Sequence, residues 1–289
     1  MMNFGSVLTA MVTPFNAEGN IDYEQTTVLI EYLLNHGTQG LVVAGTTGES
    51  PTLTEDEKVN LFTHVVQVVN KRVPVIAGTG SNNTQSSIAL TKKAENCGVD
   101  GIMLVAPYYN KPNQTGMYEH FKAVASVTSL PIILYDIPGR SVVTISAETI
   151  IKLSKLDNIV SVKAASGDLD QIAEIIEQTD DDFTVYSGED GVTLPMLAIG
   201  ATGVISVASH IIGNDLNEMI QAFQHGEVKK AASIHRRMLP VMNALFKAPS
   251  PAPVKAALQM KGIDTGSVRL PLVPLSETEQ QQLKQYIDR

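Results

Sequence analysis

A lysine stands at the end of a segment that otherwise has the composition of a buried strand. The segment is Ile159-Val160-Ser161-Val162-Lys163-Ala164-Ala165, and its β-branched residues are typical of strands. Lysine is rarely buried without a partner or a function. An amine moved from water into an apolar site is favoured in its neutral, nucleophilic form. The alternative is a strand that ends at the surface with Lys163 in water, and the segment alone does not exclude it.

Side chains able to assist such an amine follow or close other apolar runs of the chain. They are Thr46 and Thr47 between two glycines, Tyr109, Tyr135 and Arg140. A neutral lysine attacks a ketone to form an imine, and the imine nitrogen then draws electrons so that an enamine carbon nucleophile forms without metal or cofactor. A tyrosine on the neighbouring strand is suited to carry the protons. The threonine hydroxyls and amides, or the arginine, are suited to hold the carboxylate of a keto acid.

Each of these residues also has an ordinary structural explanation. Tyr109 and Tyr135 could be amphipathic rings with their hydroxyls at the surface. Thr46 and Thr47 could only shape a turn, and Arg140 could be a solvated loop charge. The fold that holds these side chains therefore decides between the two interpretations.

Eight short runs rich in Val, Ile and Leu recur along the chain, most of them followed by a helical pattern. Near-continuous apolar character is typical of parallel strands covered on both faces, and eight alternations predict an α/β fold, a (β/α)8 TIM barrel. A doubly wound sheet is the competing interpretation, but Gly78-Thr79-Gly80 lacks the third glycine and the acidic residue of a dinucleotide site. The runs are residues 7–12, 41–44, 75–77, 101–105, 132–135, 159–162, 183–186 and 204–207.

The strand and helix rhythm stops near residue 225. Residues 228–245 and 254–261 have helical patterns, and a capping box of Ser276 and Glu279 opens a last helix. A similar box of Thr54 and Glu57 opens a helix within the barrel region. The sequence therefore predicts a catalytic barrel over residues 1–225 and a C-terminal helical domain over residues 226–289.

Composition excludes several classes of function. A net charge of -9 and a pI near 5.1 argue against nucleic-acid binding, which needs clustered basic residues. No apolar run approaches the ~20 residues that cross a bilayer, and residues 1–15 lack the basic start of a signal peptide. The single cysteine, Cys97, fits a reducing cytoplasm. The histidines never occur at ligand spacing, and the pair Glu189-Asp190 is typical of a helix cap, so no metal is expected.

Three motifs together resemble the pyruvate-dependent class I aldolase family, and the similarity runs over essentially the whole chain. They are Gly45-Thr46-Thr47-Gly48-Glu49, Tyr135-Asp136-Ile137-Pro138-Gly139-Arg140 and Val162-Lys163. The resemblance implies that Lys163 forms a Schiff base with pyruvate and that the enamine adds to aspartate 4-semialdehyde. The product then cyclises to the heterocyclic precursor of diaminopimelate and lysine.

The resemblance also implies roles for individual residues. Tyr135 would exchange protons at the imine, linked through Thr46 to Tyr109, which in this family is donated across a tight dimer interface. A homo-oligomer, commonly a dimer of dimers, is therefore expected. The remaining positions match the substrate site: Thr46 and Thr47 at the pyruvate carboxylate, Arg140 at the semialdehyde carboxylate, and Gly188 and Ile205 around the substrate.

One departure from the family concerns feedback inhibition by lysine. Asn82 and Tyr108 match the effector site, but Glu55 and Lys58 stand where lysine-inhibited members carry basic and polar residues, and Ser86 replaces a glutamate that would hold the effector's amine. We expect weak or absent inhibition, and a clear micromolar inhibition curve would contradict this.

Two other functions remain as alternatives. An N-acetylneuraminate lyase shares the lysine and the tyrosine, but Arg140 favours a short acidic aldehyde, which needs a carboxylate clamp. A non-catalytic metabolite-binding barrel would have no need to keep the lysine, tyrosine and threonines together.

Overall fold

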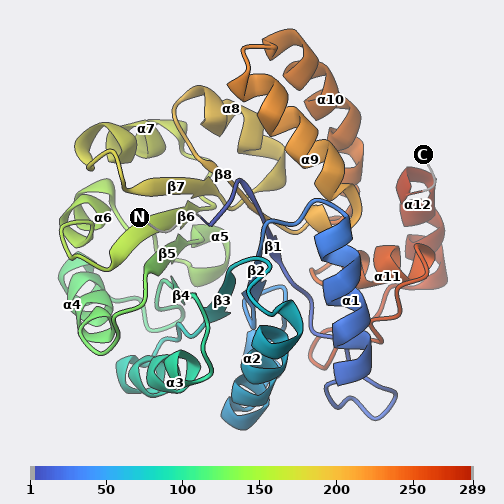
Figure 1. Ribbon diagram of the computed structural model, residues 1–289, viewed down its shortest axis with the longest axis horizontal. Helices are drawn as coiled ribbons and strands as arrows, with labels where there is room; N and C mark the ends of the chain where they lie inside the picture. Colours follow the sequence, from blue (N-terminus) through green and yellow to red (C-terminus); the bar gives the residue numbers. More distant parts are fainter. Residues whose placement is uncertain (1–3, 288–289) are drawn as a thin grey trace.

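The computed structural model describes residues 4–287, which form a closed barrel of eight parallel strands ringed by helices (Figure 1). Neighbouring strands pair in chain order, and β1 closes the barrel against β8. The predicted (β/α)8 barrel is confirmed, and the doubly wound alternative is wrong. The strands are β1 (Val7–Ala10), β2 (Gly40–Val43), β3 (Val75–Gly78), β4 (Gly101–Val105), β5 (Ile132–Asp136), β6 (Ile159–Ala164), β7 (Thr184–Ser187) and β8 (Gly203–Ser206).

Most of the helices around the barrel begin at a side-chain cap. Thr54 and Glu57 form the predicted capping box, in which each side chain accepts a hydrogen bond from the other residue's backbone N–H. The helices and 3₁₀ turns of this region are α1 (Tyr23–Asn35), η1 (Ser50–Thr52), α2 (Glu55–Val69), α3 (Thr84–Asn96), α4 (Gln114–Ala125), α5 (Pro138–Ser141), α6 (Ala147–Leu153), α7 (Leu169–Gln178), η2 (Asp190–Val192), α8 (Thr193–Ala198) and α9 (Ser209–Gln224).

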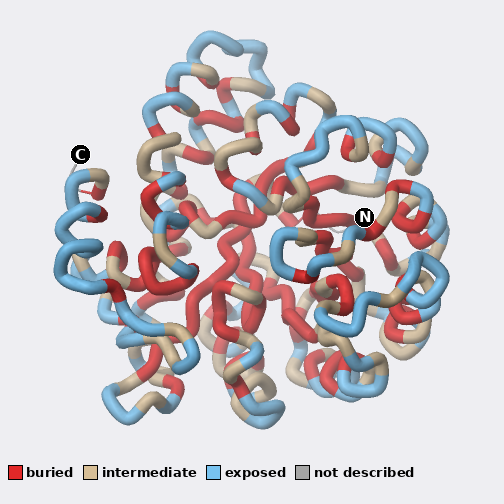
Figure 2. The backbone as a smooth tube through the Cα atoms, turned by 180° about the vertical axis from the view of Figure 1, so that it is seen from behind, coloured by how far each residue is buried: buried red, intermediate tan, exposed pale blue. Residues whose placement is uncertain are grey.

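Apolar side chains fill two spaces, one inside the barrel and one between the barrel and its helices. Because the strands are covered on both faces, the backbone is buried through the centre of the molecule (Figure 2). The interior cluster consists of Phe4, Leu8, Ala10, Val42, Ile76, Met103, Ile133, Tyr135, Tyr186 and Ile205. The barrel is therefore a packed core that leaves room for chemistry only at its end.

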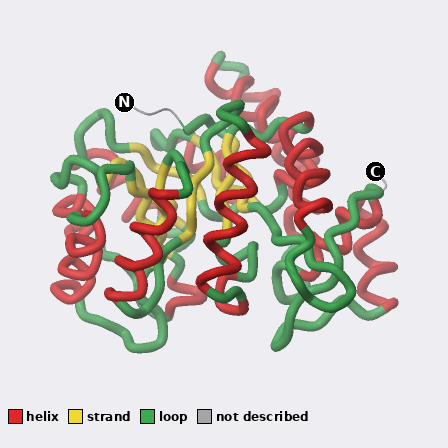
Figure 3. Tube along the Cα trace, turned by 60° about the horizontal axis from the view of Figure 1, so that its bottom comes forward, coloured by secondary structure: helices red, strands yellow, loops and turns green. Residues whose placement is uncertain are grey.

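Three further helices follow the barrel: α10 (Val228–Ala244), α11 (Ala252–Met260) and α12 (Glu277–Ile287). They lie to one side of the strands (Figure 3), where α10 packs on α9 and α11 contacts both α9 and α12. The predicted helices of this region are confirmed, and the Ser276–Glu279 capping box forms. None of the helices in residues 4–287 is long and apolar enough to span a membrane.

Candidate active site

Lys163 and Tyr135 lie side by side on neighbouring strands at the barrel mouth. β5 and β6 are parallel, with Tyr135 opposite Lys163, and the lysine Nζ lies 4.2 Å from the centre of the tyrosine ring. Each residue is only 4% exposed, and each is the last but one of its strand. Active sites of such barrels form at these strand ends. The alternative of a strand that ends at the surface with its lysine in water is therefore wrong.

Gly188 leaves the space that the Lys163 side chain occupies. A Cβ added to Gly188 would lie 3.1 Å from both Cγ and Cε of Lys163, and 2.7 Å from the Cβ of Ala165. Its N–H donates to the carbonyl of Ala164 at 2.7 Å. The glycine is thus fixed against β6 directly beside the lysine, and any larger residue would displace the amine or the backbone.

The loop after β2 carries the two threonines in a tight turn. The Glu49 N–H donates to the Thr46 carbonyl at 3.1 Å, and the Ser50 N–H donates to the Gly45 carbonyl at 3.2 Å. Thr46 borders the cavity described next, whereas Thr47 is buried and is not part of its lining. The turn therefore places Thr46 in the lining of a cavity that Tyr135 also borders.

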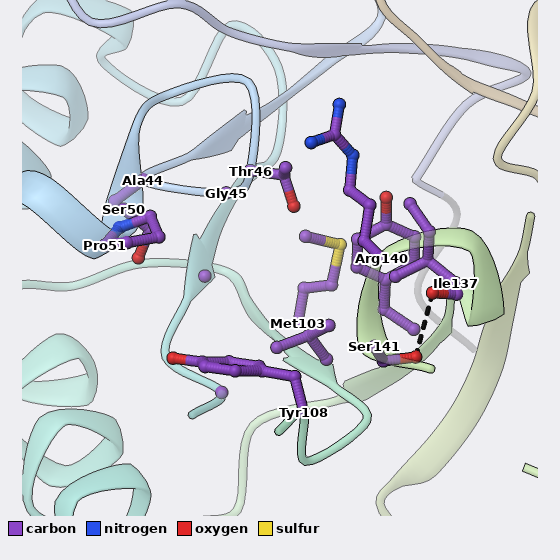
Figure 4. A pocket seen from close by; sticks show the side chains of 14 residues that line it. Ala44, Gly45, Thr46, Ser50, Pro51, Met103, Tyr108, Ile137, Arg140 and Ser141 are labelled. Carbon is purple, nitrogen blue, oxygen red and sulfur yellow. Dashed lines mark hydrogen bonds between the residues drawn. The ribbon is translucent and has the colours of Figure 1, made fainter. Parts of the chain in front are cut away.

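A cavity of about 230 Å³ opens at this end of the barrel. Figure 4 shows Thr46 and Arg140 pointing toward the same space, with Met103 beneath them. Tyr135 and Tyr108 also border it. The cavity thus combines an apolar floor with hydroxyls, phenols and one cation, the chemistry of a small anionic ligand site.

A second cavity, of about 540 Å³, lies on the other side of Arg140. Ile137 and Arg140 line both cavities, and the second one reaches Gly188. Its far wall is formed by Met242, Asn243 and Phe246, at the C-terminal end of α10 and just beyond it. Arg140 therefore stands between the barrel end and the C-terminal helices.

Asp190 is a buried acidic residue near the lysine. Its carboxylate accepts hydrogen bonds from the Ser206 hydroxyl and from the N–H groups of Val207 and Ala208. Burial raises the pKa of Asp190, while these hydrogen bonds and the charge of Lys163 oppose the rise. The carboxylate binds the turn that precedes α9, but neither Glu189 nor Asp190 caps a helix through its side chain, so the predicted helix cap is wrong. Among the described residues, no group of acidic, histidine or cysteine side chains is arranged to hold a metal ion.

Comparison with known proteins agrees with this geometry. A model of the dihydrodipicolinate synthetase family matches residues 3–289 of the chain. The chain belongs to the dihydrodipicolinate synthetase family.

Relatives in this family match the chain from end to end. A 4-hydroxy-tetrahydrodipicolinate synthase of Halalkalibacterium halodurans is 63% identical over 100% of this chain and 99% of the relative. The enzyme of that name from Bacillus subtilis is 59% identical, with 99% of both chains covered. The crystal structure of a dihydrodipicolinate synthase from Bacillus anthracis superimposes with a TM-score of 0.98 at 61% identity, covering 100% and 99% of the two chains.

Four residues expected in the dihydrodipicolinate synthetase site are not among the residues that line either cavity: Lys163, Thr47, Tyr109 and Ile205. Tyr109 is 87% exposed and has a left-handed backbone with φ of 72°, so the described chain does not bring it to Tyr135. Ile205 on β8 is buried inside the barrel, in one cluster with Tyr135 and Tyr186. Among the described residues, the phenols that border the first cavity are Tyr108 and Tyr135.

Sequence reasoning missed a contact behind the threonine loop. Glu49, the last residue of the Gly-Thr-Thr-Gly-Glu motif, forms a buried ion pair with Lys255 of α11. A lysine surrounded by apolar residues in the helix Ala252–Met260 was the available signal. The sequence does not indicate which acid it meets, because the two residues lie near opposite ends of the chain.

Proposed function

We propose that this chain is a 4-hydroxy-tetrahydrodipicolinate synthase, a lyase that condenses pyruvate with L-aspartate 4-semialdehyde in the synthesis of diaminopimelate and lysine. The observation that carries the proposal is the placement of Lys163 Nζ, buried and 4.2 Å from the Tyr135 ring centre. Within residues 4–287, this amine makes no hydrogen bond or ion pair. It is therefore free to attack a carbonyl carbon.

The proposed reaction uses the residues around the lysine in sequence. The Lys163 nitrogen adds to the keto carbon of pyruvate, and loss of water gives an iminium ion. Loss of a proton from the methyl carbon then gives an enamine, whose carbon attacks the aldehyde carbon of the semialdehyde, and the aldehyde oxygen takes up a proton. Tyr135 is positioned to carry these protons. The amino group of the semialdehyde part then attacks the iminium carbon, which closes the ring and breaks the bond to Lys163, so that the lysine leaves as a free amine.

We propose that two parts of the barrel mouth bind the substrate carboxylates. Thr46 and Thr47 are proposed to hold the pyruvate carboxylate through hydroxyl and backbone N–H groups. Arg140, between the two cavities, is proposed to bind the carboxylate of the semialdehyde, since a guanidinium matches a carboxylate in two parallel hydrogen bonds. Gly188 and Ile205 would shape the site around the bound substrate.

The environment of Tyr109 supports a proposed homo-oligomer, a dimer of dimers. A tyrosine with positive φ costs of order 1–3 kcal/mol and persists where its surroundings demand it, yet this ring is mostly exposed in the single chain. Donation of Tyr109 to the site of a second copy would account for both features.

The proposed location of the enzyme is the cytoplasm. An acidic chain with small-molecule substrates and a single cysteine suits that compartment.

Weak or absent inhibition by lysine also stays a prediction. Glu55 forms an ion pair with Lys93 of α3, and burial lowers the pKa of Lys58. Neither side chain can replace the histidines that lysine-inhibited members carry at this site. Initial rates measured at increasing lysine concentration should therefore show no inhibition in the micromolar range.

Borohydride reduction in the presence of pyruvate tests the proposal. The imine should be trapped as a stable secondary amine, and peptide mapping should locate it on Lys163 alone. Lys255 serves as the internal control, because it is equally buried but ion-paired. Absence of an adduct would contradict the mechanism and favour the non-catalytic barrel. Turnover of aspartate semialdehyde, but not of N-acetylneuraminate, would then exclude the related lyase.

A further inference from the structure

A second buried lysine links the C-terminal helices to the threonine loop. Lys255 of α11 and Glu49 have side chains only 3% and 1% exposed, and Lys255 Nζ lies 2.9 Å from Glu49 Oε1. The same ammonium donates to the carbonyl of Ser267 at 2.7 Å. Charges are buried in this way only when they are paired, so the contact specifies where α11 meets the loop.

Both carboxylate oxygens of Glu49 contact the C-terminal region, Oε2 through a hydrogen bond and Oε1 through the ion pair. Its Oε2 accepts a hydrogen bond from the backbone N–H of Arg269 at 2.9 Å, while Lys255 lies at Oε1. The Arg269 guanidinium is itself fixed, since it donates to the carbonyls of Gly19 and Thr52 and to the carboxylate of Glu57. The Phe15 ring lies beneath both cations, 4.2 Å from Lys255 Nζ and 4.4 Å from Arg269 Cζ.

The backbone of Glu49 connects this cluster to Thr46. Glu49 has a left-handed conformation with φ of 57°, which is unfavourable for a residue with a Cβ and persists only where surrounding contacts impose it. In this conformation its N–H closes the turn by donating to the Thr46 carbonyl. Glu49 therefore takes part in both structures: its carboxylate contacts Lys255 and Arg269, and its backbone closes the turn at Thr46.

We infer that Lys255 and Glu49 are positioning residues for the pyruvate site, through which the C-terminal helices hold the Thr46-Thr47 turn in its binding conformation. The inference rests on the proposed function and assigns the helical region a part in substrate binding. An ion pair kept only for stability is a weak explanation, because a buried pair is often no more stabilising than apolar residues of similar size.

The test separates binding from folding by using neutral replacements. Glu49→Gln, Lys255→Met and the double variant are compared with Arg237→Met, which removes an exposed ion pair between α10 and α9. For each, the KM for pyruvate, kcat, the Tm and the extent of borohydride trapping at Lys163 are measured. The single variants should raise the KM for pyruvate about tenfold with little change in kcat, since they loosen binding without removing a reacting group.

The double variant distinguishes positioning from stability. Removing both charges should restore the Tm toward that of the unmodified chain, since no buried charge is left unpaired, but the KM for pyruvate should stay raised. Arg237→Met should change neither quantity. If a single variant fails to fold, the KM for pyruvate of the double variant tests the inference by itself.

Two results would overturn the inference: an unchanged KM in folded variants, or a KM that recovers together with the Tm. Failure of the proposed function is a separate result, because the unmodified chain would then form no pyruvate adduct on Lys163.

Discussion

Two lysines, Lys163 at the barrel mouth and Lys255 in α11, are buried to the same extent, but the side chains around them differ. They are 4% and 3% exposed, and each Nζ lies 4.2 Å from the centre of an aromatic ring, Tyr135 or Phe15. Lys255 has the Glu49 carboxylate at 2.9 Å. For Lys163, residues 4–287 supply no such partner.

The difference indicates that burial alone does not mark a reactive amine. A carboxylate beside an ammonium stabilises the charged form, and Lys255 has one: burial lowers its pKa to about 8, and Glu49 opposes the shift, so it remains mostly protonated at pH 7. The acidic residue near Lys163 is instead Asp190, which already accepts hydrogen bonds from three donors. The ring beneath Lys163 also carries a hydroxyl, which Phe15 lacks.

Exchanging each lysine for methionine should produce opposite effects, and these are the largest that we predict. Lys163→Met should lower kcat at least roughly 10³-fold, because the nucleophile is gone, while leaving stability unchanged or raised, since no partner is left unpaired. Lys255→Met should retain kcat but lose about 3–5 kcal/mol of stability, because the Glu49 carboxylate stays buried without a counter-charge. Steady-state kinetics and urea unfolding measure both.

The double variant Glu49→Gln with Lys255→Met is the control for this exchange, and it should recover most of the lost stability. Equal destabilisation by Lys163→Met and Lys255→Met would show that the two sites do not differ as described.

Tyr135→Phe makes the ring beneath Lys163 the same as the ring beneath Lys255. If the phenol carries protons at the imine, kcat should fall by roughly 10²-fold with an unchanged fold by circular dichroism. Borohydride trapping of pyruvate should become slower but still reach Lys163. A variant of near-normal rate would assign the Tyr135 hydroxyl a packing role only.

Gly188→Ala tests the space around Lys163 without changing a reacting group. The new Cβ would lie 3.1 Å from two carbons of the lysine and 2.7 Å from the Cβ of Ala165. Displacement of the amine by a fraction of an ångström should lower kcat/KM by roughly 30-fold. Gly116→Ala, outside the lining of both cavities, is the matched control, because an added Cβ there meets no atom closer than 3.4 Å. Equal rates for the two variants would contradict a tightly fitted Lys163.

Much of the barrel mouth follows from the sequence because chain order sets spatial order in this fold. Consecutive strands are neighbours, so a tyrosine ending one run and a lysine ending the next must meet, as Tyr135 and Lys163 do. The apolar runs are readable because both faces of each strand are covered.

The contact of Glu49 with Lys255 could not be predicted in this way. No periodicity relates a residue of a β-strand loop to one in a helix beyond the barrel, and the pairing depends on how α11 packs. The short helix Pro138–Ser141 that carries Arg140 was also missed, because four residues are too few for a helical pattern. Long-range packing, rather than local propensity, sets both features.

The smallest predicted effect concerns acid and the charged cluster around Lys255. Hydrogen bonding to Arg269 lowers the pKa of Glu57 from its ordinary value to about 2, against the opposing effect of burial. A carboxyl whose pKa is lower in the folded state stabilises the fold above its ordinary pKa near 4.5 and loses that contribution as the pH falls toward 2. With the partial exposure of this pair, the contribution at pH 7 should be about 1 kcal/mol.

Glu57→Gln isolates this contribution, because the amide oxygen can still accept the capping hydrogen bond from the Thr54 N–H. Urea unfolding at pH 6 should show the variant less stable than the unmodified chain, and the difference should shrink steadily between pH 4.5 and pH 3. Glu31→Gln, which removes an exposed ion pair with Arg72, should give a smaller difference at pH 6. A pH-independent deficit in Glu57→Gln would mean that packing, and not the charge on Glu57, stabilises the junction between α2 and the C-terminal region.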